Sequence, residues 1–148
     1  VHEYTSLLAA AHHTMFGAAP WRMHAEQAFL FHYRNLDHFL LGGGGTADIH
    51  AADYAPLETP PWDLPLWRGV WREVIDDRLD RLSYARLTQQ PWCAHQWVPR
   101  LDAEVRTAWR AFYDALTDRE YRAEFVRQVE MRRRELIPFH VRVELLYV

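Results

Sequence analysis

The sequence predicts an all-α fold, an up-and-down bundle of about five helices, and three observations favour it. Apolar residues recur at helical spacing through most of the chain. Prolines at positions 56, 60, 61 and 65, prolines at 91 and 99, and a glycine run at 42–45 divide it into blocks of helix length. Several of these blocks are joined by short connections, as in bundles whose helices alternate in direction.

Composition places the chain among ordinary globular domains. It has 148 residues, of which 49% are hydrophobic and 25% charged, so we expect one domain spanning residues 1–148. A single cysteine, Cys93, excludes an internal disulfide and a cysteine-based zinc site. Because no apolar run approaches the ~20 residues of a membrane span and no secretory signal is recognisable, we expect a cytoplasmic protein without membrane contact.

The first two predicted helices cover residues 2–16 and 20–41. Gly17 ends the first, Pro20 suits the first turn of the second, and the glycine run stops the second. Their apolar stripes are Tyr4, Leu7, Leu8, Ala11 and Met15 in the first, and Phe29, Tyr33, Leu36 and Leu40 in the second. Residues 42–64 are expected to form a long loop, mobile over residues 42–53, because glycine maximises backbone entropy.

The second half of the chain predicts three further helices. The third begins near Pro65 and runs to about Leu82 or Leu87, and an aromatic loop follows over residues 88–99. The fourth covers residues 101–116. Thr117 and Glu120 have the spacing of a capping box that opens the fifth, which ends before Pro138. The tail 141–148 is rich in valine, leucine and tyrosine, which favours a short strand.

Charged residues interrupt the apolar stripes. Glu26 and Asp37 lie within ~40° of Tyr33 on a helical wheel, and Arg78 falls inside the stripe of the third helix. Because a lone buried charge is very unfavourable, we expect these acids to face Arg78. The favoured interpretation is an ion pair that fixes helix order, and the alternative is a ligand pocket. The candidate pocket residues are Glu26, His32, Tyr33, Asp37, Trp67, Trp71 and Arg78.

Nine histidines suggest a metal site, but their spacing does not support one. No two histidines are four residues apart, and no glutamate precedes a histidine by three, so we expect neither a metal nor a cofactor.

Arg34 and His38 are four residues apart on the outward face of one helix, where both could contact one ligand. Exposed pairs of this kind are more often simply solvated.

Charge disfavours a general nucleic-acid binder. The net charge is −3, and residues 1–75 carry four arginines against eight acids. Such a surface repels phosphates, so RNA is the less favoured partner. Trp62, Trp92 and Trp97 fall outside the helical stripes, and tryptophan and arginine dominate the energetics of protein interfaces. A homodimer or another protein partner is therefore favoured.

Two segments resemble a family of small bacterial helical proteins. Residues 31–40, FHYRNLDHFL, resemble its Phe/Leu-His-x-Arg-Asn-Leu-x-x-Phe helix. A second block of the family is similar to Ile75, Asp76, Asp77, Leu82, Ser83, Tyr84, Arg86 and Leu87. Arg81 stands where the family usually has histidine. The family is similar in architecture to HEPN domains, which are helical bundles of bacterial defence and toxin systems.

The resemblance implies a dimer and, in HEPN ribonucleases, a site shared between two chains. Their arginine steadies a phosphate, and their histidine, separated from it by four to six intervening residues, acts as general base on a ribose hydroxyl. Here Arg34 and His38 have only three residues between them, and Pro138 breaks the helix between Arg134 and His140. We therefore expect no catalytic residues in this chain.

The sequence leaves three functions open. The favoured one is a non-enzymatic helical bundle that acts by binding a partner or forming a homodimer, in a bacterial defence or toxin–antitoxin context. The first alternative is a metal-independent ribonuclease that uses Arg34 and His38. The second is a small-molecule binding protein whose polar pocket contains Glu26, Asp37 and Arg78.

Overall fold

The computed structural model describes residues 2–42, 48–71 and 94–136. Every regular element in these ranges is helical, which confirms the predicted all-α bundle. The elements are α1 (His2–Phe16), α2 (Ala19–Leu41), α3 (Ala51–Tyr54), the π-helix η1 (Trp67–Trp71), α6 (Ala94–Ala115) and α7 (Arg119–Leu136). In these ranges no helix has both the length and the apolar character needed to span a bilayer.

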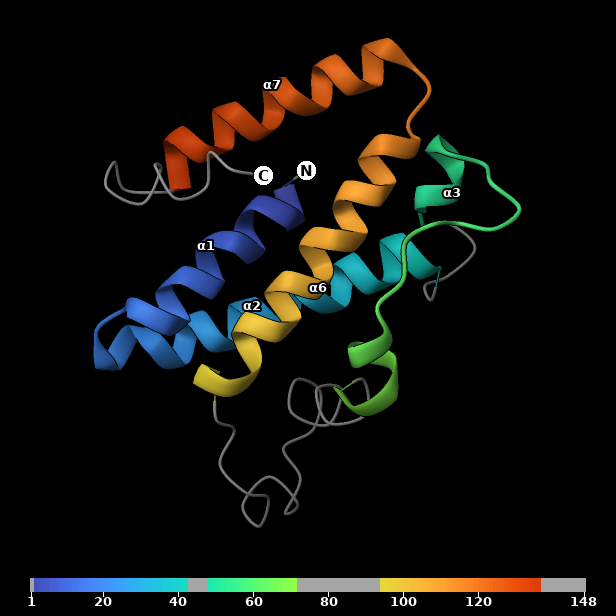
Figure 1. The fold of residues 1–148 in the computed structure, drawn as a ribbon. Coiled ribbons are helices and arrows are strands. Elements are labelled where there is room, and N and C mark those ends of the chain that lie inside the picture. Colours follow the sequence, from blue (N-terminus) through green and yellow to red (C-terminus); the bar gives the residue numbers. More distant parts are fainter. Residues whose placement is uncertain (1, 43–47, 72–93, 137–148) are drawn as a thin grey trace.

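Helices α1 and α2 form an antiparallel hairpin, with α6 alongside and α7 crossing above α1 (Figure 1). Two glycines shape the hairpin as predicted. The Gly17 N–H donates to the His13 carbonyl at 2.9 Å, and a side chain at Gly17 would collide with that oxygen. Gly42 ends α2 in the left-handed conformation, with φ of 70°.

The core lies where α1, α2 and α6 meet. The predicted stripe of α2 is buried, because Phe29, Tyr33, Leu36 and Leu40 all face this core. Helix α1 contributes Tyr4, Leu7 and Leu8, and helix α6 contributes Leu101, Val105, Ala108, Trp109 and Phe112. The helical period of the sequence therefore identified the buried faces.

The predicted loop over residues 42–64 contains one short helix, and parts of it are packed into the core. Residues 51–54 form α3, and Ala51 and Leu64 are completely buried. Trp62 is also buried, and its Nε1–H donates to the Leu40 carbonyl at 2.7 Å. This bond satisfies a carbonyl that the end of α2 leaves without a helical partner. Trp62 is thus a core residue and offers no binding surface. Residues 43–47 lie outside the described part.

Two predicted boundaries in the second half are also wrong. Helix α6 begins at Ala94, so residues 94–99 are helical, with Pro99 inside the helix. The helix tolerates this proline because it removes only one hydrogen bond near the N-terminus, while Val98 is buried. Helix α7 is capped by Asp118 in place of Thr117, since its Oδ1 accepts the Glu120 N–H at 2.7 Å. The predicted strand and most of the third helix lie outside the described residues.

Candidate functional site

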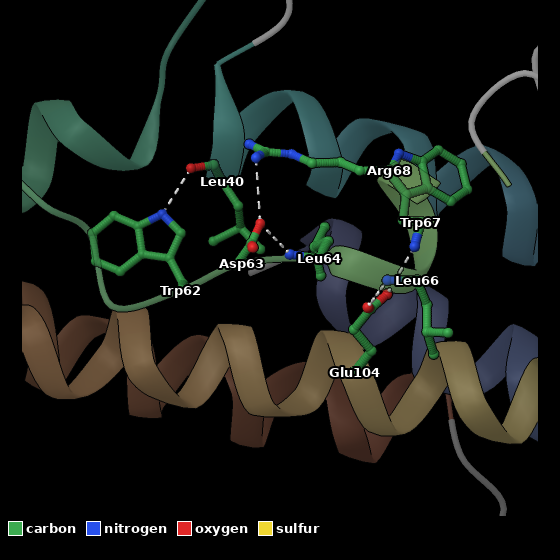
Figure 2. A network of polar contacts seen from close by, with 8 residues as sticks. All are labelled: Leu40, Trp62, Asp63, Leu64, Leu66, Trp67, Arg68 and Glu104. Carbon is green, nitrogen blue, oxygen red and sulfur yellow. Dashed lines mark hydrogen bonds and ion pairs between the residues drawn. The ribbon is translucent and has the colours of Figure 1, made fainter. Parts of the chain in front are cut away.

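A polar network centred on Glu104 joins three distant segments, and Figure 2 shows its contacts with Leu66 and Trp67. The carboxylate projects from α6 and accepts the Tyr33 hydroxyl of α2 at 2.6 Å. It also accepts the backbone N–H groups of Leu66 at 2.5 Å and of Trp67 at 3.3 Å. These two groups belong to the first turn of the helical segment that leads into η1, so Glu104 satisfies N–H groups that a helix start leaves without partners.

Tyr33 lies at the buried end of this network. Its ring is stacked on Trp67, with ring centres 4.6 Å apart. Burial raises the pKa of the Tyr33 hydroxyl far above its usual value, and its hydrogen bond to Glu104 and the charges of Glu104 and Asp37 act in the same direction. Tyr33 therefore remains a neutral hydrogen-bond donor. It positions its neighbours and cannot serve as a base.

The structure describes some of the predicted pocket residues, and others lie outside its described part. Tyr33 and Trp67 come together as described, and Asp37 is only 3% exposed. Glu26 is partly buried on α2. Arg78 and the side chain of Trp71 lie outside the described residues, so the ion pair between an acid of α2 and Arg78 stays a prediction.

His32 belongs to a separate cluster between α1 and α2. Its Nδ1 lies 2.7 Å from Glu3 Oε2, and Asn35 Nδ2 donates to the same oxygen at 3.0 Å. Burial raises the pKa of the Glu3 carboxyl, but the two hydrogen bonds and the charges of His32 and His2 outweigh it and leave this pKa below its usual value. The cluster ties the start of α1 to the middle of α2.

Sequence reasoning missed Glu104, although a signal was present. Glu104 follows Leu101 by three residues and precedes Ala108 by four, and both neighbours belong to the core face of α6. A helical wheel of this segment would have placed the carboxylate inward, like Asp37 on α2. Its partners come from segments 38 and 71 residues away in the sequence, which no local pattern reveals.

Arg34 and His38, the alternative ribonuclease pair, both belong to α2 and are partly buried. The Arg34 guanidinium lies 5.9 Å from the centre of the Phe31 ring. The His38 backbone carbonyl accepts the Gly42 N–H at 3.0 Å and lies 3.2 Å from His50 Nδ1. These contacts stabilise the end of α2, and a catalytic role for the pair stays a prediction.

A shallow groove of about 560 Å³ runs along one side of the α1–α2 hairpin, and we call it the α1–α2 groove. It is lined by Ser6, Ala9, Ala10, His13, Gly17, Ala18, Trp21, His24, Ala25, Ala28 and His32. Trp21, one of its lining residues, is 69% exposed, and Phe16, which precedes the lining residue Gly17, is 72% exposed. Among the described residues that line it, none is an arginine, lysine, aspartate or glutamate.

No group of three or more potential metal ligands lies within residues 2–42, 48–71 and 94–136. Comparison of the chain with family models, with curated proteins and with solved structures finds no match. Arguments about function therefore rest on the chain's own residues.

Proposed function

We propose that this protein acts by self-association, with a second copy of the chain docking on the α1–α2 groove. The observation that carries the proposal is the exposure of Phe16 and Trp21 beside a groove floored by alanines. Large exposed apolar side chains that adjoin one another mark interaction surfaces, and tryptophan is enriched among residues that dominate binding energy.

The shape of the surface supports a second copy as the occupant. A two-fold interface requires one patch to complement itself, so it must carry both a projection and a recess. Here Trp21 supplies the projection, and Ala9, Ala25 and Ala28 supply the recess within the same groove. A two-fold axis through the groove seats Trp21 of each copy on the alanines of the other.

The charge of the groove supports a protein partner over RNA. RNA-binding surfaces neutralise phosphates with arginine or lysine. The described lining residues include neither, and the chain carries a net charge of −3. Three histidines, His13, His24 and His32, are the ionisable groups among the described residues that line it.

The test is the oligomeric state in solution, measured by sedimentation velocity from ~1 to ~100 µM, a range that covers weak to moderate dimers. We expect a concentration-dependent dimer. Ala28→Glu buries an unpaired charge at the interface and should weaken association at least ~10-fold. Trp21→Ser should act in the same direction because it removes the projecting ring.

Leu57→Ser is the matched control, since Leu57 is a well-exposed apolar residue outside the groove. It should associate like the wild type, and circular dichroism should show that all variants remain helical. A wild type that stays monomeric throughout the range, or groove variants that associate as well as Leu57→Ser, would refute the proposal. The defence context and the ribonuclease alternative stay predictions, because no contact described above bears on them.

A further inference from the structure

A cavity of about 210 Å³ lies beneath α7, and we call it the α7 cavity. Six of its eight lining residues are aromatic, and they come from α2, α3, α6 and α7. They are Phe39, Tyr54, Trp109, Phe112, Tyr121 and Phe125. This cavity is separate from the α1–α2 groove and from the Tyr33–Trp67 pair, with which it shares no residue.

The rings form walls around the cavity. Phe39 and Phe112 meet at 90° with ring centres 5.3 Å apart, and Tyr54 and Tyr121 meet at 79° and 5.5 Å. Edge-to-face contact is a favourable arrangement for such ring pairs, so these rings pack firmly against one another. Trp109 and Phe125 lie 5.5 Å apart and close the side between α6 and α7.

The charge of the lining is negative. Of the described residues that line the α7 cavity, Glu124 alone is charged. Arg127 donates to its two oxygens at 2.6 and 2.7 Å, and Gln128 donates to one of them at 2.7 Å. These hydrogen bonds hold the pKa of Glu124 at about 2, so the carboxylate remains ionised. Arg127 is not among the described residues that line the cavity.

One buried polar group in the wall lacks a partner. Trp109 is 5% exposed, and its Nε1–H has no acceptor among the described residues. A buried donor without an acceptor costs free energy.

We propose that the α7 cavity binds a small organic cation of the alkylammonium class. Faces of tryptophan and tyrosine rings attract such cations, and aromatic boxes recognise methylated ammonium groups. Glu124 supplies the opposite charge at the wall. The volume is below the ~300 Å³ at which pockets for drug-sized ligands begin, so the ligand is a compact head group.

Choline is the probe that matches this description, and its neutral analogue 3,3-dimethylbutan-1-ol has the same shape without the charge. Choline is titrated into the full chain, and its binding is measured by calorimetry and by tryptophan fluorescence. Both measurements should show saturable binding. The neutral analogue should bind at least ~10-fold more weakly, because it gains no cation–π attraction. Equal binding of the two would overturn the cationic class. Absence of saturable choline binding up to ~50 mM would overturn the site itself.

Two surface variants locate the binding. Tyr121→Leu keeps apolar bulk but removes a ring face, and Glu124→Gln keeps the shape but removes the charge. Each should weaken choline binding ~5-fold or more without unfolding the chain, since both side chains are exposed. Glu120→Gln and Phe31→Leu are the matched controls, because Glu120 is an exposed acid of the same helix and Phe31 an exposed ring elsewhere. Equal loss in variants and controls would contradict the assignment.

Discussion

Replacing Glu104 by alanine tests whether the three-segment network stabilises the fold. The substitution removes the acceptor of the Tyr33 hydroxyl and of the Leu66 and Trp67 N–H groups, whose bonds measure 2.6, 2.5 and 3.3 Å. The three donors differ in their access to water, and this difference determines the cost. Tyr33 is completely buried, the Trp67 bond is partly buried, and the Leu66 bond is exposed.

The magnitude follows from these environments. A buried hydroxyl left without an acceptor costs about 1–3 kcal/mol, and the partly buried Trp67 N–H adds about 1 kcal/mol. Water replaces the acceptor at Leu66, so that bond adds little. We expect Glu104→Ala to lower the free energy of unfolding by about 2–4 kcal/mol, a large share of the ~5–15 kcal/mol of a typical domain. Glu104→Gln should cost less, since its amide oxygen still accepts.

Urea unfolding followed by far-UV circular dichroism measures these differences. In Tyr33→Phe the hydroxyl is absent, so Glu104→Ala in that background should cost ~1–2 kcal/mol less than in the wild type. Asp114→Ala is the matched control on α6, because Asp114 is exposed and pairs with Arg110 only at 4.0 Å; it should change stability by less than ~0.5 kcal/mol. The reasoning fails if Glu104→Ala behaves like Asp114→Ala, or if its cost is the same with and without the Tyr33 hydroxyl.

Three further substitutions test other contacts by the same unfolding assay. Trp62→Phe removes the buried 2.7 Å bond to the Leu40 carbonyl and should cost about 1–2 kcal/mol. Burial raises the pKa of Asp102 above its usual 3.8 despite the pairing with Arg106, so stability is lost as pH rises from about 3.8 through the raised folded-state pKa. Asp102→Asn should be at least as stable as the wild type near neutral pH. Over that window its free energy of unfolding should change less with pH. The pKa of Glu3 is lowered below 4.5, so its contribution is present above that pH and lost as pH falls through the folded-state value. Glu3→Gln should remove this acid-side loss, an effect of about 0.5 kcal/mol because the carboxylate is part-exposed.

Local information in the sequence predicted α1 and α2 well. The periodic positions of Phe29, Tyr33, Leu36 and Leu40 identified the buried face, because a helix with one apolar stripe has one way to face a core. Glycine marked both helix ends for steric and conformational reasons that do not depend on distant residues. These parts of the fold follow from neighbours in the sequence.

The errors arose where distant packing overrides local preference. Pro99 and the nearby tryptophans favour a loop, yet burial of Val98 keeps the segment helical. In the sequence, Trp62 lies outside the apolar stripes and therefore suggests an interface residue. In the structure it is buried and donates to the carbonyl of Leu40, which is 22 residues away in the sequence. Among the candidate pocket residues, Tyr33 and Trp67 are stacked in the structure, but Glu104, which joins them, was not foreseen.

The Glu104 network also has a consequence for the order of folding. Its bond to Tyr33 closes a chain loop spanning 71 residues, whereas the contacts of the α1–α2 hairpin are local. Closing long loops costs more entropy than closing short ones, so the hairpin is expected to form first, with the tyrosine hydroxyl still hydrated. Docking of α6 then removes that water and fixes the start of the segment leading to η1. On this route we expect loss of the carboxylate to accelerate unfolding more than it slows folding, so that the network lengthens the lifetime of the native state.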